Sequence, residues 1–399
     1  MKKTTILLCL SLLCLSSWAQ NSVDRILEQV KKNNLSLKAQ KQVSQSNKLS
    51  VAAEYSPLEN TEVEVSPFVA ASKDASTRCD VSIMQAFAFP STYLSQKKIV
   101  SLSQEKSELE YIKTERQTLQ EARQLCTQII YCNRMQKALQ ERKQRAQMVF
   151  DYTNRMQQSG EVSLMESNSA KLFLVQITHA IQNNDFEIKS LLRQLQSLNG
   201  GKAIVLADTI YPNSLANKDM MSNNYIDSLI SSCIANNPEL QSLNIDKEIA
   251  EKEVRLAKSQ YLPSLALGYK GELSQEGSLH GIGVGVSLPL FSNSKKVQAA
   301  KAKTSIYSLL SDDAMLQFSS VMHSTYDNII LLKEIIDGHK QTLQEIATDK
   351  MLEKALTYSE ISPVQYYQDL NSYYEIVDEI LSLEKDYQLL LNELLQYTR

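Results

Sequence analysis

Four short segments of the chain alternate apolar and polar residues with a period of two. These segments are 61–71, 79–89, 265–274 and 280–290. In the last of them Ile282, Val284 and Val286 alternate with glycines. Such alternation predicts β-strands, because successive side chains of a strand point to opposite faces of the sheet. The pattern therefore predicts two strand pairs, each with one apolar face and one small or polar face.

Two long segments, 93–158 and 293–358, carry residues that favour helices, and the first contains neither glycine nor proline. Gly338 is the one weak point of the second. A helix of about 66 residues would be roughly 100 Å long. Each long segment is followed by a shorter helical one, at 163–198 and 363–397. The sequence thus predicts a long helix and a returning helix after each strand pair.

The last returning helix has the apolar spacing of a coiled coil. Its apolar positions step alternately by three and four residues, and they are Tyr373, Ile376, Ile380, Leu383, Tyr387, Leu390, Leu394 and Tyr397. This spacing is typical of an a/d seam that packs against a neighbouring helix. Tyr373 of the seam also belongs to a cluster with Tyr366, Tyr367 and Tyr374, for which one interpretation is packing between helices; the resemblance described below implies the other, that the cluster lines a constriction.

Both turns between long and returning helices have helix-capping chemistry. Ser163 with Glu166, and Ser362 with Gln365, fit the capping box of serine followed three residues later by an acid or amide. A proline follows the second serine and is well tolerated at a first helical position. Gly160 can adopt the left-handed conformation that ends a helix. The sequence therefore predicts two sharp helical hairpin tips.

The chain carries this plan twice. Asn33-Asn34, Phe89-Pro90 and Glu161-Val162-Ser163 are followed about 200 residues later by similar segments. The later segments are 236–237, 288–289 and 360–362. A period this long is typical of a duplicated half rather than of a short solenoid repeat. We predict a first structural repeat over 21–199, a linker over 200–224 and a second repeat over 225–399.

Composition narrows the class of protein. Residues 1–20 have the basic start, apolar core and small-residue cleavage site of a secretory signal peptide. No later apolar run approaches the ~18 residues of a membrane helix. The formal net charge is −3 and the charges of both signs are balanced, so the sequence shows no excess of basic residues that would indicate nucleic-acid binding. The four cysteines that follow the signal peptide show no metal-ligand spacing, and we expect small buried thiols.

The sequence lacks the residue patterns that would indicate an enzyme active site. The four histidines are scattered and none has an acidic or cysteine partner at ligand spacing; His280 lies near a strand turn. The chain has no glycine-rich phosphate loop and no nucleophile elbow. We therefore predict no catalytic residues, no metal site and no cofactor.

The strands allow two interpretations. Segments of about ten residues with an apolar and a small or polar face fit a transmembrane barrel. A half-buried antiparallel sheet in a soluble domain shows the same alternation. Four strands cannot close a barrel, so the sheet either packs on another element or is pooled among several chains. The predicted export signal favours a barrel whose strands are pooled among several chains.

These features resemble those of the TolC-like outer-membrane efflux proteins. Residues 235–240 (Ala-Asn-Asn-Pro-Glu-Leu) resemble the family's opening helix break, and 261–265 (Tyr-Leu-Pro-Ser-Leu) its approach to the strand. Residues 285–291 (Gly-Val-Ser-Leu-Pro-Leu-Phe) resemble the exit into the long helix. Ala88-Phe89-Pro90-Ser91 is similar to the family's Phe-Pro-Gly element, with serine in the place of glycine. The resemblance covers about residues 22–397.

The resemblance implies a mainly α-helical protein with a small β part that assembles as a homotrimer. Four strands per chain would form a twelve-stranded transmembrane β-barrel, and the long coiled-coil helices a trimeric α-helical barrel. The implied function is an exit duct in the outer membrane of a Gram-negative cell, with a periplasmic extension. It would conduct substrates passively from a periplasmic membrane-fusion adaptor and an inner-membrane pump of the RND or ABC type. Its further partner would be outer-membrane lipid.

The resemblance also suggests roles for the tips. Adaptor contact is implied for both turns, at Gly160, Val162, Ser163, Ile361, Ser362 and Pro363. A gate that opens when the helices untwist is implied nearby, with the candidates Glu166, Gln365, Tyr366, Gln368 and Asp369. The acidic rings of the family's constriction fall here on Gln365 and Gln368, and Asp369 is one place off register. Glu166 has two open roles, as capping-box partner and as gate charge.

A second functional class remains open. A periplasmic coiled-coil adaptor or scaffold that never spans the membrane would also explain the helices and the export signal. It explains poorly the successive glycines of 281–285, because a soluble sheet gains nothing from them. An adaptor would also carry one helical hairpin in a β-rich chain, rather than two equivalent halves.

Overall fold

The computed structural model describes residues 22–54, 60–69, 77–212, 223–274, 277–289, 294–346, 348–358 and 360–398. The predicted signal peptide and part of the predicted linker, 213–222, lie outside these residues. The chain divides into two units. A helical unit comprises 1–38, 114–233 and 319–399, and a sheet-bearing unit comprises 39–113 and 234–318.

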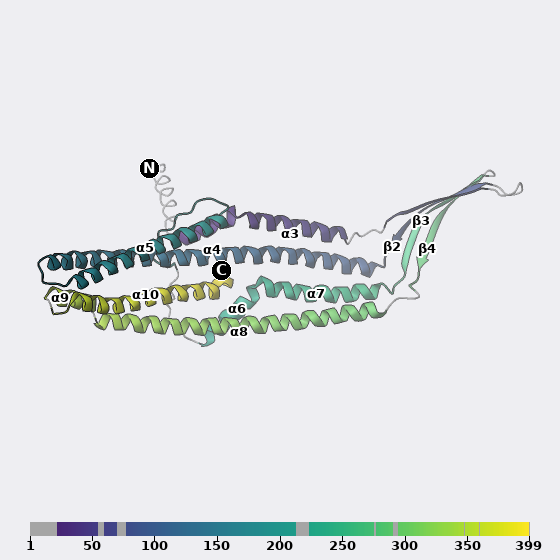
Figure 1. The fold of residues 1–399 in the computed structure, drawn as a ribbon. Coiled ribbons are helices and arrows are strands. Elements are labelled where there is room, and N and C mark those ends of the chain that lie inside the picture. The colour runs from purple at the N-terminus through teal and green to yellow at the C-terminus, as the bar shows by residue number, and fades with distance from the viewer. Residues whose placement is uncertain are drawn as a thin grey trace, which may run out of the picture. The chain divides into compact units, whose positions relative to one another are not determined.

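The predicted helices and their repetition are present (Figure 1). The helices of the first half are α2 (Ser22–Asn33), α3 (Leu35–Glu54), α4 (Pro90–Gln158) and α5 (Leu164–Leu198). Those of the second half are α6 (Asn223–Asn236), α7 (Pro238–Ser259), α8 (Ser294–Ile346), α9 (Thr348–Thr357), α10 (Pro363–Leu394) and the short η2 (Leu395–Tyr397). The second long helix is thus described in two parts, with residue 347 outside the description. Among the described helices, none is long and apolar enough to cross a membrane.

All four predicted strands form, and they belong to one antiparallel sheet. The strands are β1 (Glu62–Phe68), β2 (Arg78–Phe87), β3 (Ser264–Ser274) and β4 (Gly277–Ser287), in the spatial order β1-β2-β3-β4. The pairing of β2 with β3 joins the two halves of the sequence (Figure 1). The predicted bounds differ from the observed ones by up to three residues: three segments extend beyond the end of their strand, and the third segment, 265–274, begins one residue late. Residues 288–289 follow β4, and 70–71 and 290 are outside the described residues.

In each half an asparagine separates the first two helices and caps the start of the second. The side-chain oxygen of Asn34 accepts a hydrogen bond from the backbone N–H of Leu37, and that of Asn237 accepts one from Glu239, both at 2.9 Å. Asparagine is a preferred N-cap because its side chain satisfies a backbone donor that the helix leaves unpaired. The repeated asparagine pair in the sequence therefore marks the same local structure twice.

Polar contacts fix how the helices of the sheet-bearing unit pair. Lys106 on α4 bonds both carboxylate oxygens of Asp246 on α7 at 2.8 Å. Seven residues along each helix, Lys113 lies 3.0 Å from Glu239. Helical residues seven apart lie on one face, so these two bridges hold α4 antiparallel to α7 in one register. Because α4 belongs to the first half and α7 to the second, the bridges join the halves.

The described residues of the helical unit include two apolar cores. One packs α2, α4 and α5 with the segment around Leu206, and its innermost residues include Val30, Ile129 and Leu195. The other lies near the hairpin tips and packs Val149 of α4, Ala170 of α5 and Leu370 of α10. Burial of apolar surface of this kind supplies most of the stability of such helices.

Helix α10 is buried over a wider face than the predicted seam. Of that seam, Ile380, Tyr387 and Leu394 are buried, but Tyr373 is only half-buried. The most buried positions also include Leu370 and Leu391, and the polar Gln388 and Asn392, which lie outside the seam. The buried face of α10 is therefore wider than the predicted seam, because α10 packs against more than one neighbour.

Glycine is required at one point of the sheet. A Cβ atom at Gly268 would lie 1.9 Å from the carbonyl oxygen of Ile83, whereas one at Gly281 would meet nothing within 4 Å. We expect Gly268→Ala to destabilise the sheet by about 2 kcal/mol through forced backbone shifts. Gly281→Ala should have little effect. Amide hydrogen exchange of β2 and β3 measures both, and equal exchange in the two variants would contradict the close approach.

Candidate functional site

The sheet separates polar from apolar residues across all four strands. The pairing aligns Val63 with Ile83, Tyr269 and Ile282 on one face. The neighbouring row, on the other face, aligns Glu64 with Ser82, Lys270 and Gly281. Because side chains alternate between faces, this register continues the same division into the adjoining rows. The predicted alternation in single strands thus becomes two continuous surfaces of opposite character.

The apolar face of the sheet is exposed in the chain. Ile282 is 83% exposed and Val284 73% exposed, and Val63, Leu265 and Leu267 are more than half exposed. A contiguous exposed apolar surface is uncommon on a monomeric protein, and marks contact with a protein partner or a membrane.

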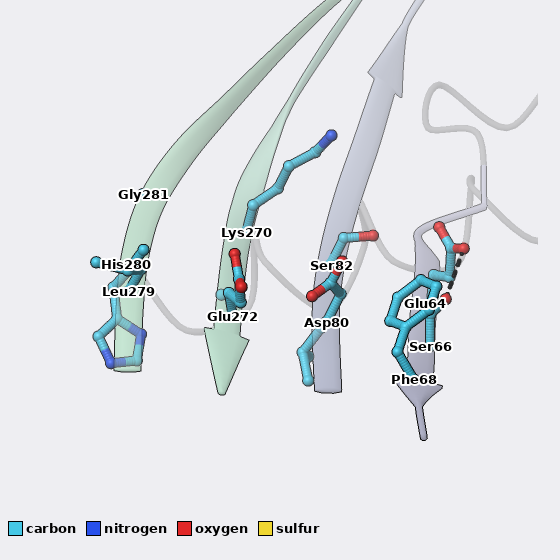
Figure 2. Close-up of a pocket in the computed structure, with 12 residues that line it drawn as sticks. Glu64, Ser66, Phe68, Asp80, Ser82, Lys270, Glu272, Leu279, His280 and Gly281 are labelled. Atoms are coloured by element: carbon cyan, nitrogen blue, oxygen red, sulfur yellow. Dashed lines mark hydrogen bonds between the residues drawn. The ribbon is translucent and has the colours of Figure 1, made fainter. Parts of the chain in front are cut away.

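The polar face of the sheet surrounds an open hollow of about 480 Å³ (Figure 2). Charged residues of three strands line it, namely Glu64 of β1, Asp80 of β2, and Lys270 and Glu272 of β3. The Ser66 hydroxyl donates to Glu64 at 2.9 Å. Arg78 lies 3.5 Å from Glu272 and stacks over the ring of Phe68. The hollow is therefore open to solvent and lined by charge, on the side of the sheet opposite the apolar face.

His280 was predicted as a solvated residue of a strand turn; it is exposed as expected, but it belongs to strand β4. Its Nδ1 atom contacts the hydroxyl of Tyr269 on the neighbouring strand, and the two rings are stacked with centroids 5.9 Å apart. Both residues lie on the apolar face, by the alternation of their strands. Among the described residues, no group of three or more histidine, cysteine or acidic side chains could hold a metal ion.

The first hairpin tip has the predicted capping chemistry in full. Gly160 adopts a φ of 80°, and the backbone N–H of Glu161 donates to the carbonyl of Met156 at 2.9 Å, which closes the end of α4. The Ser163 hydroxyl accepts from the backbone N–H of Glu166, and the Glu166 carboxylate accepts from the backbone N–H of Ser163. Glu166 is thus the reciprocal partner of a complete capping box.

Hydrogen bonds from the Ser163 side chain and backbone lower the pKa of Glu166. A lowered folded-state pKa means that the ionised carboxylate stabilises the cap above the usual glutamate range, and that this contribution is lost as pH falls through the folded pKa. We expect Glu166→Ala to lower the protection factors of the amides in the first turn of α5. Acid should do the same in the unsubstituted protein, when exchange is compared with the intrinsic rate at each pH. Gln365→Ala is the control, and an equal loss of protection at both tips would contradict the assignment.

The second tip is capped differently. Ser362 accepts from the backbone N–H of Gln365, and Pro363 occupies the first turn of α10. The side chain of Gln365 donates instead to Asp369 at 2.8 Å. The predicted capping box at Ser362 is therefore only half formed, because its amide partner is used one turn further along the helix.

The tip and gate candidates occupy different environments. Gln365 and Gln368 are exposed, Asp369 is half-buried, and Tyr366 is only 3% exposed. The Tyr366 ring packs in the core near the tips, edge-on to Tyr367. Of the residues predicted for contact, Pro363 is buried, Val162 and Ile361 are half-buried, and Gly160, Ser163 and Ser362 are exposed.

Sequence reasoning missed an ion pair near this core in which the arginine is buried and the aspartate is partly exposed. Arg142 of α4 donates to Asp378 of α10 through both terminal nitrogens, and Nη1 lies 2.7 Å from Oδ2. The guanidinium also stacks over the ring of Tyr374, with its carbon 4.3 Å from the centroid. The two charges lie more than 200 residues apart in the sequence, so neither helical spacing nor a motif could have paired them.

The remaining predictions concern the cysteines. Cys126, Cys132 and Cys233 are buried free thiols, and Cys79 is a half-buried one. Burial raises the pKa of Cys126 to about 12 and of Cys132 to about 11, so both stay protonated and unreactive at neutral pH. The expectation of small buried thiols is confirmed for these three residues.

Comparisons with known proteins find the fold but no close relative. No protein-family model and no curated protein matches the chain. The outer-membrane channel OprN superposes with a TM-score of 0.77 at 11% identity, over 94% of this chain and 89% of OprN. The chain has the fold of OprN. CusC, solved in work on folding and transmembrane channel formation, gives 0.73 at 13% identity, over 96% and 95% of the two chains. The CmeC outer membrane channel of Campylobacter jejuni gives 0.68 at 14%, over 94% and 85%.

Proposed function

We propose that this protein is the outer-membrane exit duct of a tripartite efflux system of the TolC type. Three copies assemble, and the four strands of each contribute to a twelve-stranded barrel in the outer membrane. Substrates pass from a periplasmic adaptor and an inner-membrane pump through the duct to the exterior. Conduction is passive, and the chain carries out no catalysis.

One observation supports this proposal above the others. The sheet has an exposed apolar face, a charged face, and a pairing order that leaves β1 and β4 at its edges. Within a bilayer every backbone N–H and C=O group must be satisfied by the protein, which rules out an open sheet edge. Pairing β1 of one chain with β4 of the next satisfies both edges. The apolar face then meets lipid, and the charged face lines a water-filled lumen.

The hairpin tips are the proposed contacts for the adaptor. They present Gly160, Val162 and Ser163 in one half, and Ile361, Ser362 and Pro363 in the other. Tight turns fixed by caps give a rigid surface, and rigidity lowers the entropy lost on binding. The gate is proposed to open as helices untwist near these tips, with Gln365, Gln368 and Asp369 closest to the constriction.

Glu166 and Tyr366 are proposed to support the gate rather than to line it. The carboxylate of Glu166 is held by its own helix cap, and the ring of Tyr366 packs inside the chain. If either residue lined the open pore, opening would first have to break the cap of α5 or unpack the core around Tyr366. The conductance of the Glu166→Gln and Tyr366→Phe variants is the measurement that tests both assignments.

Fractionation tests the proposed function directly. The protein should occur in the outer-membrane fraction, resist carbonate washing, and leave detergent micelles as a trimer in native mass spectrometry. An unrelated protein that binds the outer membrane only peripherally is the control, because carbonate should release it. Release by carbonate alone, or a monomer in mild detergent, would show that the sheet does not enter the membrane.

A further inference from the structure

The helical unit contains a cavity that the proposed conduction does not use. It has a volume of about 310 Å³ and is lined by side chains of α4, α8 and α10, and by Tyr211 of the segment that follows α5. Four segments distant in sequence thus converge on one space. Its floor is partly apolar, since Ile336 and Tyr387 line it and are both buried.

The cavity has an excess of positive charge. Arg134, Lys333 and Lys340 line it against only two carboxylates, Asp337 and Glu384, which leaves one positive charge over. Glu384 is already engaged twice, with Oε2 2.5 Å from Arg134 Nη2 and Oε1 2.5 Å from Lys340 Nζ. A cation would add to the excess of positive charge, whereas a single negative charge would neutralise it.

The cavity also holds a hydrogen-bond donor that the chain does not use. The hydroxyl of Tyr211 is buried and donates its proton to no described residue, because the neighbouring Arg134 guanidinium, which stacks over its ring at 5.3 Å, can only donate to it. Burial raises the pKa of Tyr211, so its hydroxyl keeps its proton at neutral pH and can donate. A buried polar group without a partner costs free energy, which a bound acceptor would recover.

We propose that this cavity binds a small organic monocarboxylate. Its carboxylate accepts hydrogen bonds from the Tyr211 hydroxyl and from the ammonium group of Lys333, which lines the same cavity. Its apolar body lies on Ile336 and Tyr387. The cavity volume matches a compact aromatic or short aliphatic acid rather than a drug-sized molecule. A bound acid would tie α4 to α8 through groups that no sequence motif brings together.

Calorimetry with benzoate and its uncharged isostere benzamide tests this site on the full-length protein in detergent. Benzoate should bind and benzamide should not, because only the first supplies the missing charge. Lys333→Gln and Tyr211→Phe should each weaken benzoate binding about tenfold, the effect of losing one hydrogen bond to a charged group. Lys171→Gln, at an exposed lysine of α5 outside the cavity, should leave binding unchanged.

A second readout is independent of binding heat. Saturating benzoate should raise the thermal midpoint of the unsubstituted protein, through preferential binding to the folded state, and should not raise that of Lys333→Gln. Equal binding of benzoate and benzamide, or undiminished binding by both cavity variants, would overturn the proposal. So would an absence of benzoate binding. None of these outcomes bears on conduction, because a duct that fails to bind benzoate still conducts.

Discussion

Replacing Ile282 by lysine is expected to prevent assembly of the protein in the outer membrane. Ile282 lies on the apolar face of β4 and is 83% exposed in the chain. A lysine on the lipid face of a transmembrane barrel costs about 2–4 kcal/mol near the bilayer centre, and less toward the interfaces. Three copies of the substitution would act on one trimer. We expect the amount of carbonate-resistant trimer to fall at least tenfold, as measured by membrane fractionation and unheated gel electrophoresis.

The neighbouring residue provides a matched control. Gly281 lies on the polar face of the same strand, directly opposite Lys270, and a Cβ atom added there meets nothing within 4 Å. Gly281→Glu should therefore assemble like the unsubstituted protein, because its carboxylate would face Lys270 on the side of the proposed lumen. A soluble sheet would tolerate both introduced charges equally, since both positions are exposed. Equal yields of trimer from the two variants would thus favour the scaffold interpretation over the duct.

Removing Asp378 is expected to destabilise the packing of α10 more than removing its partner Arg142. The Arg142 side chain is 8% exposed and that of Asp378 is 38% exposed. Asp378→Leu leaves a buried guanidinium without its counter-ion, at a cost of about 3 kcal/mol. After Arg142→Met the carboxylate can still be hydrated, so a cost of about 1–2 kcal/mol is expected. Native-state amide exchange of α4 and α10 gives both values as local opening free energies.

The double variant sharpens this prediction. Arg142→Met with Asp378→Leu removes both charges, and should be more stable than Asp378→Leu alone, because no charge is left buried and unpaired. Removal of Lys113 from its pair with Glu239 is the control. That pair is exposed on both sides, so its loss should cost less than about 1 kcal/mol. A double variant less stable than either single one would show that Arg142 acts mainly through its contact with Tyr374.

Local chemistry made much of the fold predictable. The left-handed Gly160 and the complete cap of Ser163 are decided by a few neighbouring residues, and both were predicted from such residues. The break at Asn237 was implied by the family resemblance, although its asparagine cap is equally local. The half-formed cap at Ser362 shows the limit of this reasoning. Gln365 fits the capping pattern, yet Asp369 one turn away offers its amide a charged acceptor, and charged acceptors form the stronger hydrogen bonds.

The candidate sites were less predictable, because they depend on which elements meet. The sequence placed the tip residues on two turns, but it could not show that Tyr366 is buried while Gln368 is exposed. Periodicity predicted one seam on α10, and packing on several sides made polar Gln388 and Asn392 interior residues. The cavity around Glu384 combines four segments, and no spacing along the chain points to it.

The sequence by itself determined the duplicated order of strands, long helices and capped turns, because each depends on side-chain periodicity or on neighbouring residues. It also determined that every strand has an apolar and a polar face. Only the tertiary structure decided that β2 pairs with β3, so that four short strands form two continuous surfaces. It alone paired Arg142 with Asp378 and Lys106 with Asp246. Such choices rest on the fit and charge of whole surfaces that meet only when the chain folds, and no local pattern records them.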